Sequence, residues 1–193
     1  APDGSASASR PPERRSRLAA APARTAGGRS GRLSTFPATW MRSVAAATQA
    51  FRGWSETPPV VRARALFAFK ALLETHLDDI ARIVTTEHGK TLDESRGSVR
   101  RAIECVEVAC GAPSLLMGDA LENVGAGTDC TSVRQPIGVC AAIAPFNFPA
   151  MVPLWFLPFA VVSGNTFVLK PSEQVPLSQQ RIFQLLEQCG LPP

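Results

Sequence analysis

The sequence predicts an α/β fold in which long helices precede the start of a parallel sheet. Apolar residues recur at helical spacing between residues 43 and about 118. Two short apolar runs follow, "IGVCAAIA" and "TFVLK", with a helix-like apolar segment between them. A strand, a helix and a strand in this order begin a βαβ unit, but the chain stops at "LPP" before such a sheet could be complete. We therefore expect an incomplete α/β domain over residues 43–193.

The first 42 residues differ from the rest of the chain. They hold eight arginines against two acidic residues, whereas the whole chain has a formal net charge of +4. The positive charge therefore belongs to this segment, and the remaining residues give no indication of nucleic-acid binding. Because the segment lacks a hydrophobic period and is rich in Ser, Pro and Gly, we expect a disordered basic leader over residues 1–42. An organelle transit peptide is the alternative, which the prolines disfavour.

Three helices are expected before residue 118. The first, around "VAAATQAFRGW", should end at Pro58 and Pro59, which can also open the next helix. Gly89 suits the C-terminal cap of that next helix, and Thr91 with Glu94 forms a capping-box pattern at the start of the third. One long amphipathic helix is predicted from residue 60 to about residue 88, because a single stripe carries Leu66, Phe69, Leu73, Leu77, Ile80 and Val84.

Beyond residue 118 the hydrophobic period shortens towards two. "TDCTSVRQP" alternates and predicts a β segment near residues 119–136, and "IGVCAAIA" is typical of a strand buried on both faces. A helix over about residues 150–162, the strand "TFVLK" and a helix over "PLSQQRIFQLLEQCG" follow. Residues 144–169 carry no charge, but four prolines interrupt them, so strand and helix pieces explain this run better than a membrane span.

The five cysteines form neither a CxxC pair nor a cluster with histidine at metal-ligand spacing. Neither a zinc site nor a disulfide framework is expected. We interpret the cysteines as buried, reduced thiols in a reducing compartment, and no segment has the apolar core of a signal peptide. Cys140 lies inside the first apolar strand, which makes it a poor candidate for a nucleophile.

Asn147 and Lys170 stand just beyond the two apolar strands, where open α/β folds bind ligands. The Asn147 amide lies in a proline-framed loop, where a fixed donor can hold a developing oxyanion. Lys170 and Glu173 can together bind a polyhydroxylated ligand, because an ammonium group donates hydrogen bonds and a carboxylate accepts them. No GxGxxG pattern follows the first strand, so the standard dinucleotide fingerprint is absent. These residues alone indicate a ligand-binding α/β half-domain.

One stretch carries a family resemblance: "PIGVCAAIAPFNFPAMVPLWFLPFAVVSGNTFVLKPSEQVP". It strongly resembles the aldehyde dehydrogenase superfamily, whose cofactor domain has a PxGVxxxIxPxNxP strand and loop followed by GNxxVxKPSE. The resemblance covers roughly residues 44–193 and includes the ExGK motif of the family at Glu87 to Lys90. It implies that residues 43–193 form an incomplete Rossmann-like, cofactor-binding domain of the aldehyde dehydrogenase fold. "GSVRRAIECVEVACGAPSLLMGDALENV" is most similar to the coenzyme A-acylating branch, the methylmalonate- or malonate-semialdehyde dehydrogenases.

This resemblance implies roles for individual residues. Asn147 corresponds to the asparagine that stabilises the oxyanion, and Lys170 and Glu173 correspond to residues that hold the adenosine ribose of NAD. A glutamate at position 173 favours NAD over NADP, because it would repel a 2′-phosphate. The resemblance also implies that Ala144, Phe146 and Gln174 contact the cofactor. It implies that Arg101 binds the substrate carboxylate. The alternatives are a loop-capping amide at Asn147, a solvated strand end at Lys170 and a solvated helix surface at Arg101.

In this family a cysteine thiolate attacks the aldehyde, NAD takes the hydride, and coenzyme A collects the thioester. The cysteine and the general-base glutamate belong to the part of the family pattern beyond Pro193, so we expect the chain alone to be inactive. The resemblance implies a homo-oligomeric enzyme of valine catabolism that acts on a small semialdehyde in the cytoplasm, or in the mitochondrial matrix of a eukaryote. A hydrolytic aldehyde dehydrogenase for another semialdehyde and a non-catalytic nucleotide-binding or subunit-pairing module remain open.

Overall fold

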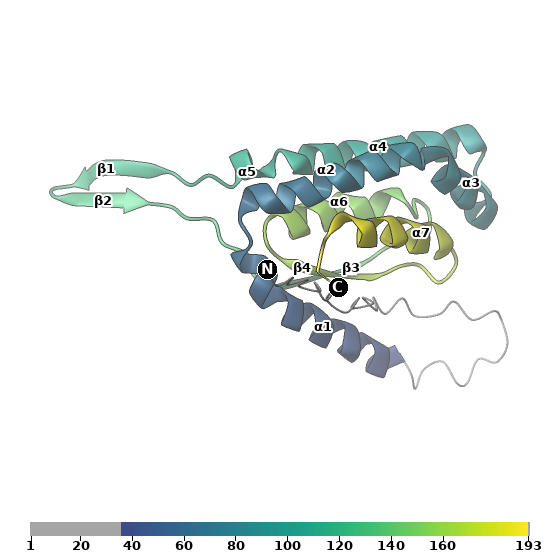
Figure 1. Ribbon diagram of the computed structural model, residues 1–193, viewed down its shortest axis with the longest axis horizontal. Coiled ribbons are helices and arrows are strands. Elements are labelled where there is room, and N and C mark those ends of the chain that lie inside the picture. Colours follow the sequence, from purple (N-terminus) through teal and green to yellow (C-terminus); the bar gives the residue numbers. More distant parts are fainter. Residues whose placement is uncertain (1–35, 193) are drawn as a thin grey trace, which may run out of the picture.

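A parallel pair of strands lies between helices in the computed structural model, which describes residues 36–192. Strands β3 and β4 have α1 on one side and α6 on the other, and α2 and α4 cover α6 (Figure 1). This arrangement agrees with the predicted α/β fold with leading helices. In chain order the elements are α1 (Phe36–Glu56), α2 (Pro59–Thr75), α3 (Leu77–His88), α4 (Leu92–Cys110), α5 (Ala112–Leu115), β1 (Ala120–Gly125), β2 (Thr128–Thr131), β3 (Val139–Ile143), α6 (Met151–Val162), β4 (Thr166–Lys170), α7 (Leu177–Leu186) and the 3-10 turn η1 (Glu187–Cys189).

Helix α1 extends further towards the N-terminus than the boundary expected at residues 42 and 43. It begins at Phe36, so residues 36–42 belong to the folded part, and the rest of the predicted leader lies outside the described residues. Trp40 and Ser43 are half-buried, and the Ser43 hydroxyl donates to the Thr39 carbonyl oxygen (3.1 Å). The expected boundary between residues 42 and 43 therefore falls inside α1.

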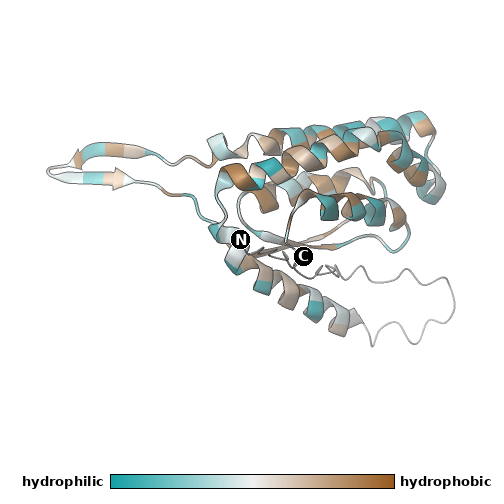
Figure 2. Ribbon diagram, in the orientation of Figure 1, coloured by the Kyte–Doolittle hydropathy of each residue, from teal (hydrophilic) through white to brown (hydrophobic). Residues whose placement is uncertain are grey.

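The single long helix predicted over residues 60–88 is wrong, because the chain bends at His76 into α2 and α3. His76 has φ −103° and ψ 15°, outside helical geometry. The predicted stripe is nevertheless correct on both sides of the bend, since Phe69 and Ile80 are fully buried. The bend lets α3 pack against α4 and α7, which a straight helix of this length would pass by. Teal and brown residues alternate along α2 and α4, as expected for amphipathic helices (Figure 2).

The start of α4 is as the sequence predicts. The Thr91 hydroxyl accepts a hydrogen bond from the Glu94 amide (3.3 Å), and the Glu94 carboxylate accepts one from the Thr91 amide (3.0 Å). These reciprocal bonds form a capping box. Gly89 caps α3 in the left-handed region at φ 87°, where a side chain would be strained.

Strands β3 and β4 pair in parallel from Val139 opposite Thr166 to Ile143 opposite Lys170, with α6 as the crossover. The expectation that β3 is buried on both faces is wrong. Its side chains are half-buried or exposed, because β4 is its only strand partner among the described residues. The Asn165 carboxamide fastens the start of the sheet, since its oxygen accepts hydrogen bonds from the amides of Ile137 (2.6 Å) and Gly138 (2.9 Å).

Two side chains hold the C-terminal end of α6. The Trp54 indole donates to the Val161 carbonyl oxygen, and the Arg62 guanidinium donates to that of Val162, both at 2.8 Å. Arg62 also donates to the Thr57 carbonyl oxygen beyond the end of α1. It is only 4% exposed, and this burial lowers its pKa. Helix α6 is thus fixed at the end far from Asn147.

The predicted β segment is the hairpin β1–β2, which extends away from the helices (Figure 1). Every residue of both strands is exposed. Cys130 of β2 therefore contradicts the expectation that all cysteines are buried, although Cys110 and Cys189 are buried and all five thiols are free. Within residues 36–192, no helix is long and apolar enough to span a membrane, and no group of side chains is suited to hold a metal ion.

Candidate nucleotide and oxyanion site

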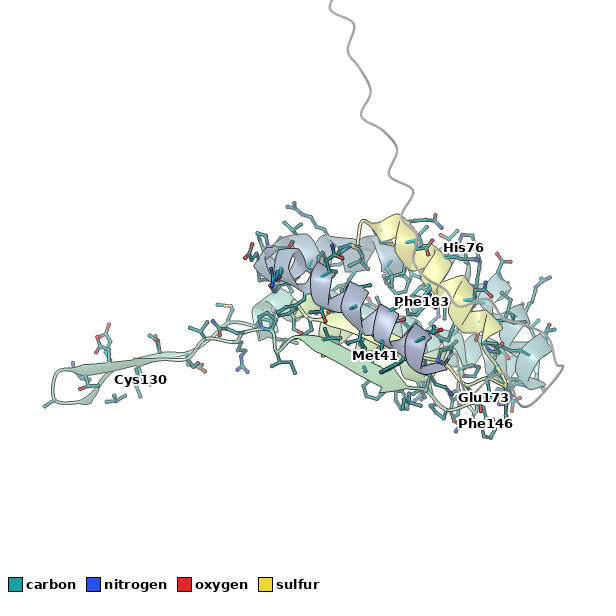
Figure 3. The ribbon with its side chains drawn as sticks, turned by 90° about the horizontal axis from the view of Figure 1, so that it is seen from below. Met41, His76, Cys130, Phe146, Glu173 and Phe183 are labelled. Atoms are coloured by element: carbon teal, nitrogen blue, oxygen red, sulfur yellow. The ribbon has the colours of Figure 1, made fainter. Side chains whose placement is uncertain are left out.

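The carboxyl ends of β3 and β4 lie side by side and bring the two predicted loops together. Ile143 pairs with Lys170 in the last position of the register, and the Ala144 amide donates to the Lys170 carbonyl oxygen (3.0 Å). The loop with Phe146 and Asn147 leaves β3 at this point, and the loop with Glu173 leaves β4. Figure 3 shows Phe146 and Glu173 at the same end of the molecule. The sequence-predicted cofactor and oxyanion residues therefore share one edge of the sheet.

Lys170 and Glu173 form an ion pair at this edge. The Lys170 ammonium donates to Glu173 Oε2 over 2.7 Å, and this hydrogen bond lowers the pKa of the Glu173 carboxyl. The Glu173 side chain is 76% exposed, and that of Lys170 is 29% exposed. Gln174 is also exposed, and its main-chain N–H donates to the Ser172 hydroxyl (3.3 Å). The carboxylate thus stays ionised and open to a hydroxyl-bearing ligand.

Asn147 is exposed in the loop between β3 and α6. Its main-chain oxygen accepts a hydrogen bond from the Lys90 ammonium (2.7 Å). Its side-chain amide has no hydrogen-bond partner among residues 36–192. In this part of the chain the amide therefore does not cap a loop. The amide is consequently available to a ligand.

Within residues 36–192, Arg101 forms no hydrogen bond or ion pair with the loops that follow β3 and β4. It is exposed on α4, nine positions after Leu92, which corresponds to about 13 Å along the helix axis. Helix α4 packs against α6, which starts just after Asn147. Arg101 therefore lies on a helix that borders the site, and a solvated surface role remains its alternative.

An exposed aromatic surface, which the sequence pattern does not predict, adjoins Asn147. Phe148 precedes α6, and Trp155, Phe156 and Phe159 are exposed on this helix, by 43%, 51% and 37%. Residues 150–162 are uniformly apolar, which indicates burial on all sides, and no spacing separates the exposed aromatic residues from the buried non-aromatic ones. The surface can contact the carbon chain of a small substrate.

The segment at the end of α3 also contacts the site, although its motif carries no assigned role. Lys90 lies 3.7 Å from the centre of the Phe148 ring, and its pKa is lowered by burial, an effect that Glu94 opposes. The His88 ring stacks on Phe146, with ring centres 6.3 Å apart. The signal in the sequence is the ExGK motif, but no local pattern shows which loops its side chains reach.

The chain is similar to known proteins in both sequence and fold. The chain matches the sequence profile of the aldehyde dehydrogenase family over residues 36–193. It is 50% identical over 151 residues to malonate-semialdehyde dehydrogenase 1 of Geobacillus thermodenitrificans strain NG80-2, an alignment that covers 78% of this chain and 31% of that protein. The chain thus spans about a third of the length of such relatives.

Solved structures show the same likeness. The fold resembles the crystal structure of methylmalonate-semialdehyde dehydrogenase from Oceanimonas doudoroffii with a TM-score of 0.78 and 54% sequence identity. The alignment covers 80% of this chain and 32% of that one. A putative methylmalonate-semialdehyde dehydrogenase from Sinorhizobium meliloti 1021, crystallised with NAD, has 39% identity, the same TM-score and the same coverage. Since the profile match includes every element from α1 onward, the chain belongs to the aldehyde dehydrogenase family.

Proposed function

We propose that this chain supplies the NAD-ribose contacts and the oxyanion donor of a coenzyme A-acylating dehydrogenase for malonate or methylmalonate semialdehyde. The observation that carries the proposal is the hydrogen bond from the Ala144 amide to the Lys170 carbonyl oxygen, which joins the two loops at one sheet edge. Relatives named as dehydrogenases of these semialdehydes, one of them crystallised with NAD, support it.

The residues at the end of β4 fit the ribose of NAD. Glu173 is ionised and exposed, so it accepts hydrogen bonds from two vicinal hydroxyls, and Lys170 donates to the same group. The 2′-phosphate of NADP would place like charges together, which favours NAD. By the family resemblance, Ala144, Phe146 and Gln174 would make further contacts with the cofactor. NAD, when bound, accepts the hydride from the substrate.

Asn147 acts on the substrate oxygen. When a thiolate adds to the aldehyde carbon, the carbonyl oxygen becomes an anion that the Asn147 amide can hold. By the family resemblance, the cysteine that provides this thiolate is not among these 193 residues. The aromatic surface on α6 would border the carbon chain of the semialdehyde, and Arg101 on the adjoining α4 would bind its carboxylate.

The wider assignments are part of the same proposal. Coenzyme A would collect the acyl group, and the complete enzyme would be a homo-oligomer that serves valine catabolism in the cytoplasm or the mitochondrial matrix. A hydrolytic dehydrogenase for another semialdehyde would release the free acid instead. A non-catalytic module would bind nucleotide without turnover.

The test is a chimera in which residues 36–193 replace the matching segment of the Geobacillus thermodenitrificans dehydrogenase, to which they are 50% identical over 151 residues. We expect NADH and an acyl-coenzyme A product from malonate or methylmalonate semialdehyde. Asn147→Ala should slow the single-turnover NADH burst by about 10²–10³-fold, the usual effect of losing one such donor.

The other outcomes separate the alternatives. A free-acid product whose formation is independent of coenzyme A would indicate the hydrolytic enzyme. A folded chimera that binds NAD and forms no NADH would indicate the non-catalytic module. The 193-residue chain alone should form no NADH above a buffer control, and measurable turnover by it would contradict the placement of the nucleophile outside it.

A further inference from the structure

The segment Glu87–Lys90 contacts both loops of the candidate site. Glu87 and His88 end α3, Gly89 follows in the left-handed region, and Lys90 stands just before α4. The side chains of Glu87 and Lys90 reach partners that are 90 and 57 positions away in the chain. One short segment therefore connects regions that the sequence keeps far apart.

Glu87 holds the element that follows the ribose loop. Its Oε2 accepts a hydrogen bond from the Leu177 amide (2.6 Å) and its Oε1 accepts one from the Ser178 amide (3.1 Å). These are the first amides of α7, which have no acceptor within their own helix, and a carboxylate there is also favoured by the helix dipole. The loop with Glu173 lies between β4 and α7. Glu87 thus anchors the far end of this loop.

Lys90 holds the oxyanion loop through its main chain. Its ammonium donates to the Asn147 carbonyl oxygen (2.7 Å) and lies 3.7 Å from the centre of the Phe148 ring. Because the peptide bond between Asn147 and Phe148 is planar, a hydrogen bond to the Asn147 carbonyl oxygen fixes the orientation of this peptide. It thereby also orients the Cα–Cβ bond of Asn147. The stacking of His88 on Phe146 supports the other side of the loop.

Gly89 allows the two side chains to diverge. Its φ of 87° turns the chain sharply after α3, and nothing would meet a side chain there, so the requirement for glycine is conformational. After this turn Lys90 reaches the β3 loop, while Glu87 faces α7.

We propose that Glu87 and Lys90 are positioning residues that set the ribose loop and the oxyanion loop from one common segment. Because both loops are attached to the segment Glu87–Lys90, this segment constrains the spacing between the ribose contacts and the oxyanion donor, in addition to the hydrogen bond from the Ala144 amide to the Lys170 carbonyl oxygen. The effect on catalysis rests on the proposed function, but the effect on the two loops does not.

The first test measures backbone motion by NMR relaxation in the full 193-residue chain. Lys90→Ala should lower the order parameters of Asn147 and Phe148 from about 0.85 to below about 0.6, with α7 unchanged. Glu87→Ala should do the same at the start of α7, with the β3 loop unchanged. Lys70→Ala and Glu104→Ala are controls with matched changes of charge, and Lys90→Arg should retain a rigid loop because it keeps a cationic donor. Unchanged order parameters, or loosening of both loops by each variant, would overturn the proposal.

The second test follows catalysis in the chimera. Lys90→Ala should slow the hydride-transfer burst about tenfold with an unchanged KM for NAD, and Glu87→Ala should raise that KM about tenfold with an unchanged burst at saturating NAD. Lys90→Ala added to Asn147→Ala should cause no further loss, since Lys90 acts through Asn147. Additive losses would overturn this role for Lys90. A wild-type burst in Asn147→Ala alone would refute the proposed function, and the relaxation result would still decide on positioning.

Discussion

Replacing Lys170 by alanine separates a nucleotide-binding role from a structural one. The pair of Lys170 with Glu173 lies at the surface, where one partner is 29% exposed and the other 76%. Ion pairs in such positions contribute little to stability, because water and salt screen them. We therefore expect the melting temperature of the Lys170→Ala chimera to stay within about 2 °C of wild type.

The affinity for NAD should change far more. A hydrogen bond from a charged group to a ribose hydroxyl typically contributes between tenfold and a hundredfold, so the Kd for NAD should rise by about 10–10²-fold. The hydride burst at saturating NAD should be almost unchanged, because the contact is present in ground and transition states alike. Titration calorimetry gives the Kd, and stopped-flow absorbance of NADH gives the burst.

Lys70→Ala is the matched control. Lys70 also pairs with a carboxylate, that of Glu74 at 3.1 Å, and its side chain is 25% exposed, but it lies on α2 away from the strand ends. It should leave both the Kd and the melting temperature unchanged. Equal Kd values for Lys170→Ala and Lys70→Ala would refute the ribose role of Lys170 and leave a solvated strand end.

Three further predictions concern the 193-residue chain. Thr91→Ala removes the hydroxyl of the capping box and should lower the free energy of unfolding, measured by urea titration, by about 1 kcal/mol. An unchanged midpoint of the urea transition would show that α4 does not depend on its cap. Cys130 should react with iodoacetamide in the native protein, whereas Cys189, whose pKa is raised by burial, should react only on unfolding, as peptide mass spectrometry can show. Because Lys170 lowers the pKa of Glu173, the stabilisation from this pair is present above the ordinary pKa of 4.5 and is lost as the pH falls through the lower folded value. Carboxyl NMR should therefore show the Glu173 midpoint rising towards 4.5 in Lys170→Ala, and an unmoved midpoint would mean that the pair does not form in solution.

Elements whose signals are local could be predicted from the sequence. The cap of α3 at Gly89 and the capping box of Thr91 and Glu94 each depend on a few consecutive residues. The order of β3, α6 and β4 follows from run lengths and turn residues in the same way. The juxtaposition of Asn147 with Lys170 also followed, because parallel strands end at one edge of a sheet.

Features that depend on packing between distant segments could not be predicted. The bend at His76 lets α3 meet α7, and the relevant contacts lie about a hundred positions further along the chain. Arg62 is buried because main-chain carbonyl oxygens accept its hydrogen bonds. Neither composition nor spacing shows which carbonyls will be close to an arginine, so this burial could not be predicted from the sequence. The contacts of Glu87 and Lys90 are of the same kind, so the motif was visible in the sequence while its geometry was not.

The hairpin β1–β2 has a consequence for how the chain responds to denaturant. It approaches no other helix or strand of the described residues, and all its side chains are exposed. A two-stranded hairpin is marginally stable in water, so its opening should cost little and should not require the helices to unfold. Its amide hydrogens should exchange at a rate that is independent of the stability of the core. A signal from Trp54, which is buried beside α6, would then report on a cooperative unit that excludes residues 120–131.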